Sequence, residues 1–121
     1  MAFDELLGGR VRTALWNRND VAEKRMFGGL VFMVAGNMCI GISGADLLVR
    51  VGPEAYAEAL SQPHVRPMDF TGRPMNGYVC VSPDGVETDE LLTAWVDRAV
   101  RYATTLPPRA ARPGRRRMKR K

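Results

Sequence analysis

The 121-residue chain contains one histidine and two cysteines, so it has few of the side chains that most often carry catalysis or bind metals. His64 lies between Pro63 and Val65 and has no cluster of acidic residues beside it in the sequence. We therefore interpret it as a loop histidine. Cys39 and Cys80 each lie within an apolar run, which favours buried free thiols over a disulfide or a shared metal. The chain also lacks a phosphate-binding glycine loop, a nucleophile elbow, a His-Glu-x-x-His pair and a Cys-x-x-Cys pair. We therefore expect no cofactor, no metal and no catalytic residue.

Long apolar runs are missing as well, because none approaches the roughly 20 residues that cross a bilayer. Asp4 and Glu5 occupy the N-terminal region in which a secretion signal would be basic. With 45% apolar and 26% charged residues, the composition is that of an ordinary soluble domain. We therefore expect a cytoplasmic protein with no membrane partner.

Acidic residues are absent from the last thirteen positions, which hold eight of the eighteen arginines and lysines. Residues 1–108 keep ten basic and thirteen acidic side chains, so the rest of the chain is mildly acidic. Pro107 and Pro108 separate the two parts. The sequence therefore predicts a folded domain over residues 1–107 and a disordered basic tail over residues 108–121.

The composition of the tail favours contact with nucleic acid. Dense arginine binds phosphates, while the lack of regular aromatic residues argues against base stacking, so any binding of DNA or RNA should be non-specific. A purely solubilising end is the alternative interpretation. The residues predicted to contact nucleic acid are Arg109, Arg112, Arg115, Arg116, Arg117, Lys119, Arg120 and Lys121.

What the chain does contain is a strongly apolar stretch from Arg25 to Val51, in which two short turns separate three apolar runs. Gly36-Asn37 predicts a two-residue hairpin loop, since both residues tolerate positive φ, and Gly44-Ala45 predicts a second loop. These loops pair Met33 with Ile40 and Ile42 with Leu47 in an antiparallel meander. One face of the meander is then wholly apolar and should be covered by helices; it consists of Val31, Met33, Ile40, Ile42, Leu47, Val49 and Val51.

The opposite face of the predicted meander has an apolar middle that is too large to be left in water. We predict that a protein partner or a second copy of the chain covers it. In the alternative interpretation, the first helix or the segment 65–70 folds over this face. The residues of the predicted partner interface are Leu30, Phe32, Val34 and Leu48.

The segments on either side of the meander predict helices and short strands. Asp4 is expected to cap a first helix that ends near Trp16, and a strand should follow over residues 23–28. Pro53 should open a second helix that ends before Pro63. The extended segment 65–70 contains Pro67, which restricts it to the edge of a sheet, and residues 77–81 predict another strand. Thr88 should cap a long helix to Leu106 whose apolar stripe covers the apolar sheet face.

The resulting fold class is α+β: a helix, an antiparallel meander, a helix, short strands and a long C-terminal helix. In this arrangement Ile40, Val49 and Trp95 should be buried together. Trp16, Trp95 and Tyr102 are interpreted as core residues and not as a platform for stacking bases.

Three segments of the chain resemble the N-terminal domain of the TfoX/Sxy competence regulators. They are residues 25–29 (Arg-Met-Phe-Gly-Gly), residues 46–51, and residues 77–81 followed by the helix around Trp95. The resemblance covers about residues 6–106. It implies a helix–sheet–helix α+β domain, similar to the secretion-chaperone type of fold, and a cytoplasmic regulator of DNA-uptake genes that acts with a transcription factor. It carries over no catalytic residues, and a basic tail stands where two-domain members have a C-terminal helical domain.

Two functional hypotheses follow. The first is a non-enzymatic binding module that recruits a protein partner, such as a transcription factor, or associates with itself, with the tail contacting nucleic acid. The second is a small enzyme with a cleft near His64, Arg73 and Tyr78. A pocket with convergent polar groups would favour the enzyme, whereas an open apolar surface would favour the binding module.

Overall fold

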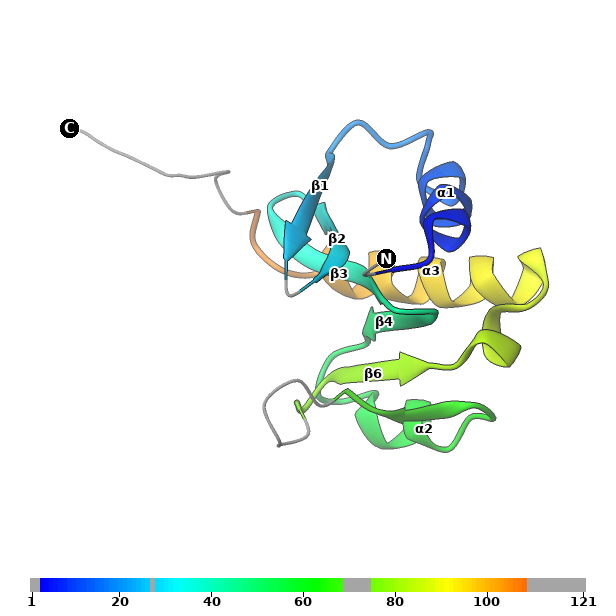
Figure 1. Cartoon of the computed structure of the whole chain (residues 1–121). Helices are drawn as coiled ribbons and strands as arrows, with labels where there is room; N and C mark the ends of the chain where they lie inside the picture. The colour runs from blue at the N-terminus through cyan, green and yellow to red at the C-terminus, as the bar shows by residue number, and fades with distance from the viewer. Residues whose placement is uncertain (1–2, 27, 69–74, 109–121) are drawn as a thin grey trace.

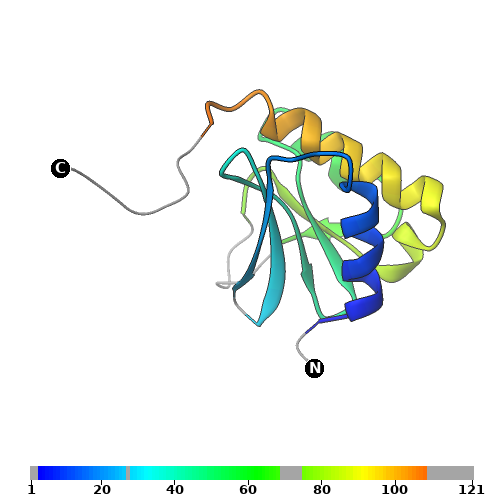
Figure 2. The same cartoon turned by 90° about the horizontal axis from the view of Figure 1, so that it is seen from above.

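The computed structural model describes residues 3–26, 28–68 and 75–108. Strands β1 to β4 are followed by two shorter strands, and all six form one antiparallel sheet in the order β1-β2-β3-β4-β6-β5 (Figure 1). Helices α1 and α3 lie on the same face of this sheet (Figure 2). The α+β prediction is therefore confirmed. In chain order the elements are α1 (Glu5–Ala14), β1 (Val21–Met26), β2 (Gly29–Val34), β3 (Asn37–Ser43), β4 (Asp46–Arg50), α2 (Tyr56–Leu60), β5 (Val65–Pro67), β6 (Tyr78–Val81), the 3-10 turn η1 (Pro83–Val86) and α3 (Asp89–Ala103).

Both long helices begin at the predicted caps. The Asp4 carboxylate accepts hydrogen bonds from the backbone N–H groups of Leu6 and Leu7 at 2.9 and 3.2 Å, and the Thr88 hydroxyl accepts one from that of Leu91 at 3.1 Å. These bonds satisfy N–H groups that have no partner within a helix. Among the helices of the described ranges, none is long and apolar enough to cross a membrane.

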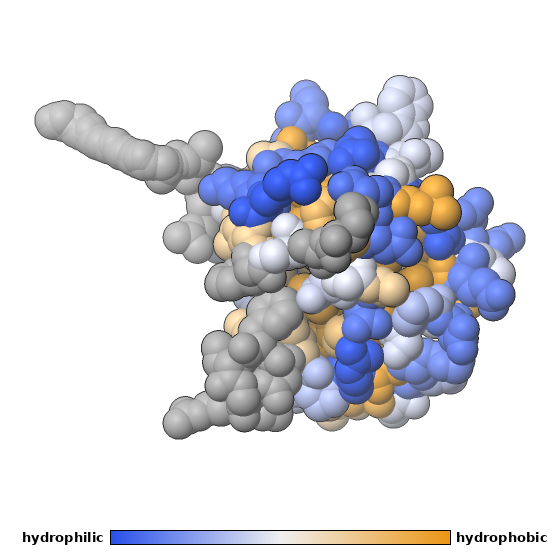
Figure 3. Space-filling model, viewed as in Figure 1, coloured by the Kyte–Doolittle hydropathy of each residue, from blue (hydrophilic) through white to orange (hydrophobic). Residues whose placement is uncertain are grey.

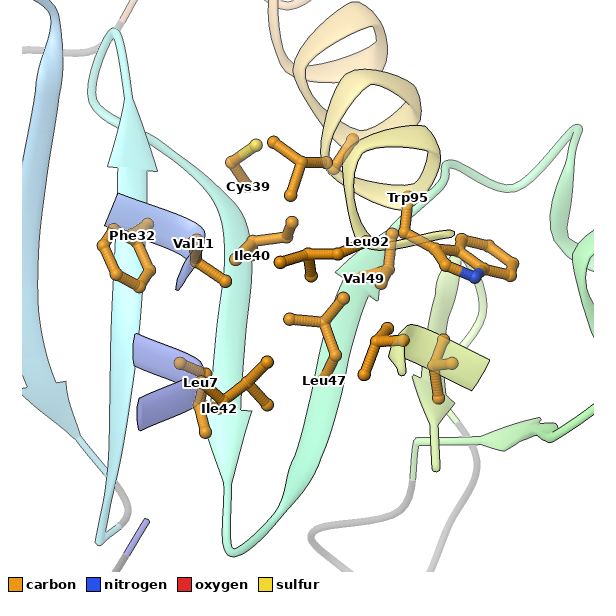
Figure 4. Close-up of a cluster of buried hydrophobic side chains, with 14 of the residues drawn as sticks. Leu7, Val11, Phe32, Cys39, Ile40, Ile42, Leu47, Val49, Leu92 and Trp95 are labelled. Carbon is orange, nitrogen blue, oxygen red and sulfur yellow. The ribbon is translucent and has the colours of Figure 1, made fainter. Parts of the chain in front are cut away.

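The core lies between the sheet and the two helices. Ile40 and Val49 face each other across β3 and β4 and are fully buried, and Trp95 of α3 belongs to the same cluster (Figure 4). This confirms the prediction that the three side chains are buried together. The pairing of β3 with β4, including Ile42 with Leu47, is also as predicted.

The hairpin between β2 and β3 is paired differently from the prediction. Its loop is Ala35-Gly36, with φ values of 51° and 82°, so Val34 and not Ala35 is the last paired residue before the turn. Met33 then pairs with Met38 and Phe32 with Ile40, which leaves Cys39 as the extra residue of a bulge. The predicted register is therefore wrong, and every side chain of β2 lies on the opposite face from the one assigned to it.

A contact from the far end of the domain explains this register. Asn37 is 4% exposed, and its side-chain amide donates a hydrogen bond to the carbonyl of Pro107 at 3.0 Å. In this position Asn37 is the first residue of β3 and pairs with Val34, outside the loop. The loop is therefore Ala35-Gly36, one position closer to the N-terminus than the predicted Gly36-Asn37. Ala35 has the positive φ that this type of loop requires.

The changed register corrects the predicted partner interface. Leu30, Phe32 and Val34 lie on the helix-covered face, where they are 3%, 0% and 0% exposed, and Phe32 lies beside Val11 of α1 (Figure 4). Leu48 is on the opposite face as predicted, but it is buried with Met68 and Cys80. The alternative interpretation is that the first helix or the segment 65–70 folds over this face; the first helix packs on Leu30, Phe32 and Val34, and Met68 packs on Leu48.

Two further predictions are revised by the structure, and others fall outside the residues that it describes. Trp16 is 80% exposed directly after α1 and is not a core residue. Helix α2 begins at Tyr56 and not at Pro53, so it is shorter than expected. The described ranges do not include Phe27, residues 69–74 or residues 109–121. Nucleic-acid binding by the basic tail and the place of Arg73 in a cleft therefore stay predictions.

Candidate functional site

The structure separates the residues of the predicted enzyme cleft. His64 is exposed at the start of β5, and its carbonyl accepts a hydrogen bond from the backbone N–H of Ser82 at 2.9 Å. Tyr78 begins β6, four residues before Ser82, which corresponds to roughly 13 Å along a strand. The imidazole and the phenol therefore have no common site, and Arg73 is outside the described ranges.

Tyr78 instead takes part in a structural contact that the sequence did not reveal. The Arg50 guanidinium lies 5.4 Å from the ring centroid of Tyr78 and 5.5 Å from that of Tyr102, and it donates a hydrogen bond to the carbonyl of Met38 at 3.3 Å. Arg50 thus connects β4 with β3, β6 and α3 through cation–π and hydrogen-bond contacts. Its partners come from three distant segments, so an isolated arginine in the sequence gave no signal of this role.

Both cysteines are free and buried, as predicted. Burial raises the pKa of the Cys39 thiol to about 12 and that of the Cys80 thiol to about 11. At neutral pH both groups are therefore protonated and poor nucleophiles. No group of three or more His, Cys, Asp or Glu side chains within the described part of the chain could hold a metal ion.

A small hollow of about 300 Å³ lies on the open face of the sheet beside Cys80. Its charged groups are already engaged, because Arg66 forms an ion pair with Asp46 at 2.6 Å and donates a hydrogen bond to the Ser82 hydroxyl at 3.1 Å. The Cys80 thiol and the Leu48 and Met68 side chains supply no acid or base for catalysis. The part of this hollow's lining that the structure describes therefore lacks the reactive groups of an active site.

The open face of the sheet does not present one broad apolar area in the described residues. The large apolar side chains that are exposed among the described residues are Leu6, Trp16 and Leu91, and they belong to α1, to the turn after it and to α3. On the side of the molecule that Figure 3 shows, hydrophilic residues likewise separate small hydrophobic areas. Half-buried Met33 and Met38 pair across β2 and β3 on this face. A continuous apolar interface of the predicted kind is therefore absent from this part of the surface.

A groove of about 570 Å³ lies on the other side of the molecule, between α1 and α3. On α1 its wall follows Leu6, Gly9, Arg10 and Thr13, which share one face of the helix because they are three and four residues apart. On α3 the wall is formed near the N-terminus of the helix. The complete lining is Glu5, Leu6, Gly9, Arg10, Thr13, Ala14, Asp89, Leu92 and Thr93.

The space beside Gly9 in the groove is open. A Cβ added at Gly9 would have no atom within 4 Å, whereas one added at the neighbouring Gly8 would lie 3.4 Å from Leu30 and 3.7 Å from Ile42. Gly8 thus allows α1 to pack closely on the sheet, while Gly9 leaves space on the outside. Glycine inside a helix costs about 1 kcal/mol relative to alanine, so helix formation alone does not account for Gly9.

The wall formed by α1 is held firmly against the edge of the sheet. The Arg12 guanidinium donates two hydrogen bonds to the Glu23 carboxylate of β1, at 2.6 and 2.8 Å, which lowers the pKa of that carboxyl. Across the groove, Arg10 reaches α3 and donates hydrogen bonds to the Asp89 carboxylate at 3.3 Å and the Glu87 carbonyl at 3.4 Å. The Arg12–Glu23 pair thus joins α1 to β1, and the Arg10 contacts join α1 to the N-terminal end of α3.

Apolar and acidic groups share the rim of the groove. Leu6 is 77% exposed on α1, and buried Leu92 forms part of the floor. A second hollow of about 520 Å³ continues along α3 and shares Asp89 and Thr93 with the groove. Its other lining residues are Glu90, Ala94 and Asp97. This combination suits a polypeptide ligand better than a small substrate, because an exposed leucine and scattered carboxylates do not enclose a molecule.

Comparison with known proteins identified the family of the chain but no individual relative. No curated protein and no solved structure matches the chain. The family model described as the TfoX N-terminal domain matches residues 14–103, from the last residue of α1 to the last residue of α3. The match contains the whole sheet, whereas most of α1, and with it one wall of the groove, precedes it. On this match, which confirms the resemblance seen in three segments of the sequence, the chain belongs to the TfoX N-terminal domain family.

Proposed function

We propose that this chain is a non-enzymatic regulatory module that binds a protein partner through the groove between α1 and α3. The observation that carries the proposal is the open groove at Gly9, beside the exposed side chain of Leu6. A protein surface that is apolar at its centre and charged at its rim is typical of binding sites for other polypeptides.

The alternative of a small enzyme has little support in the described residues. His64 directly precedes β5 and is bonded to Ser82 after the end of β6, whereas Tyr78 begins β6. Both thiols have raised pKa values, and Asp46 and Arg66 neutralise each other. An active site normally combines a concave pocket with titratable groups that converge on it. We therefore favour binding over catalysis.

Membership of the TfoX N-terminal domain family is consistent with a regulatory role. The partner that we propose is a transcription factor. We place this activity in the cytoplasm, because free buried thiols are typical of a reducing compartment. Self-association through the groove is less favoured, because the acidic rim of the groove would face the same acidic rim of a second copy.

Affinity capture from the native cell tests the proposal. The baits are the full chain, a chain stopped after Pro108, Gly9→Trp and Lys24→Trp. Gly9→Trp places an indole in the groove, whereas Lys24→Trp places the same group on exposed β1. We expect one protein to be retained by the wild-type, stopped and Lys24→Trp chains and to be lost with Gly9→Trp. Retention by Gly9→Trp would contradict the groove as the binding site.

The tail supports a second, separate proposal, which is non-specific binding of DNA or RNA. Its eight positive charges on thirteen residues contrast with a mildly acidic remainder that should repel phosphates. Engagement of about five to eight phosphates would give a log–log salt slope of roughly −4 to −7 on duplex DNA. Fluorescence anisotropy should show this slope for the full chain and no binding for the chain stopped after Pro108. Equal binding by both chains, or binding by neither at low salt, would contradict a nucleic-acid arm.

A further inference from the structure

We propose that the occupant of the groove between α1 and α3 is an amphipathic helix of the partner, with lysines or arginines beside its apolar stripe. This inference rests on the proposed function and specifies the kind of partner segment. It is carried by the shape of the groove, by its apolar contacts and by the charge of its rim.

The shape suits a third helix. The α1 wall extends from Glu5 to Ala14, which is roughly 15 Å of helix, and its outward residues follow a spacing of three and four. Side chains of a helix pack into the channel between two neighbouring helices in this manner. An amphipathic helix laid in such a channel would place one apolar side chain per turn toward the floor.

The floor offers apolar contact at close range. Gly9 has no side chain, Ala14 has a small one, and Leu92 is 2% exposed below them. A large apolar side chain of the ligand can therefore reach the space over Gly9. Leu6, which is 77% exposed in the free chain, would be covered by the same ligand.

The charge of the rim selects a basic ligand. The groove and the adjoining hollow carry the carboxylates of Glu5, Asp89, Glu90 and Asp97. Among the described residues of their combined lining, Arg10 is the one cation, and it is already bonded to Asp89 and to the Glu87 carbonyl. Lysines or arginines on the ligand would complement the remaining carboxylates, which would guide association and fix its orientation.

The same charges decide against two other occupants. A second copy that docked groove to groove would bring Glu90 and Asp97 toward their own counterparts, and like charges across an interface are repulsive. The basic tail of the chain has the complementary charge, but Met118 is its single large apolar residue. It therefore cannot supply the apolar stripe that the floor requires.

Fluorescence anisotropy with three labelled peptides of about 16 residues tests this inference on the full chain. The first peptide is an amphipathic helix with a leucine stripe flanked by lysines. The second has glutamate in place of each lysine, and the third has the composition of the first in an order without a stripe. We expect the first to bind at least about 10-fold more tightly than either control.

Variants of the chain locate the binding. Gly9→Trp should lower the affinity of the chain for the lysine peptide at least about 10-fold, and Lys24→Trp should leave this affinity unchanged. The double variant Glu90→Gln/Asp97→Asn should weaken it roughly 3-fold to 10-fold and reduce its dependence on salt, while Glu54→Gln, outside the groove, should have no effect.

Four results would overturn the inference: equal affinity for the lysine and glutamate peptides, unchanged affinity of Gly9→Trp, binding that occurs only after the tail is removed, or a dimer that occupies the groove. Failure of this inference is distinguishable from failure of the proposed function. If Gly9→Trp loses the cellular partner but the lysine peptide does not bind, the binding function stands and the basic helix is wrong. If the lysine peptide binds the groove but Gly9→Trp keeps the cellular partner, the groove can bind a basic helix but is not the site at which the cellular partner binds.

Discussion

At the scale of single residues, Gly52 shows how one backbone position determines the packing of a helix. It follows β4 with a φ of +91°, and an added Cβ would lie 2.4 Å from the Tyr102 ring. That ring is one of the two beside Arg50. We expect Gly52→Ala to lower the free energy of unfolding by about 2–4 kcal/mol, because it combines backbone strain with a steric clash. Urea unfolding of the purified chain measures this loss.

Gly44→Ala is the matched control for Gly52→Ala. Gly44 also has a positive φ, +59°, but an added Cβ there would have no atom within 4 Å. Only the backbone term remains, so we expect a loss of about 1–2 kcal/mol. Equal losses in the two variants would mean that the contact between Gly52 and Tyr102 does not constrain α3.

The Cys39 thiol should make stability depend on pH in the alkaline range. Burial raises its pKa from 9.0 to about 12, so the folded chain resists ionisation that the unfolded chain allows. The resulting stabilisation is complete below pH 9 and is lost as the pH rises toward 12. Between pH 8 and about 11, the wild-type chain should lose up to about 2 kcal/mol more than Cys39→Ala in urea titrations. Parallel pH profiles would contradict a buried, protonated thiol.

At the scale of elements, the sequence predicted what is determined locally. Asp4 and Thr88 are caps whose bonds span two or three residues, and the pairing of β3 with β4 depends on a tight turn at Gly44. The hairpin before it was misassigned because its register depends on distant groups. The bond from Asn37 to Pro107 spans seventy residues, and the bulge at Cys39 changes which side chains share a face.

Two substitutions in β2 distinguish the observed register from the predicted one. Phe32 is 0% exposed in the core, whereas Met33 is half-buried on the opposite face. We expect Phe32→Ala to cost about 3–5 kcal/mol of unfolding free energy and Met33→Ala less than about 1.5 kcal/mol. Ile40→Ala, which is in the core in either register, should cost about 2–4 kcal/mol. A larger loss of unfolding free energy for Met33→Ala than for Phe32→Ala would contradict the observed register and support the predicted one.

At the scale of the whole molecule, the family could be recognised from sequence but the candidate site could not. The segments that resemble the TfoX N-terminal domain are short and continuous, and the family match contains all of them. The groove joins residues such as Arg10 and Asp89, which are seventy-nine positions apart. In the sequence, the pair Gly8-Gly9 within the first helix is compatible with close packing on the sheet or with a break, and neither interpretation indicates a groove.

Hydrogen exchange on the complex with the captured partner, compared with the free chain, tests most directly whether the groove is the binding site. We expect slower exchange of backbone amides in α1 and in the first half of α3, over Glu5–Ala14 and residues 89–97, with β1 and β5 unchanged. Slower exchange confined to β1, β2 and β3, with both helices unchanged, would place the partner on the sheet and contradict the account.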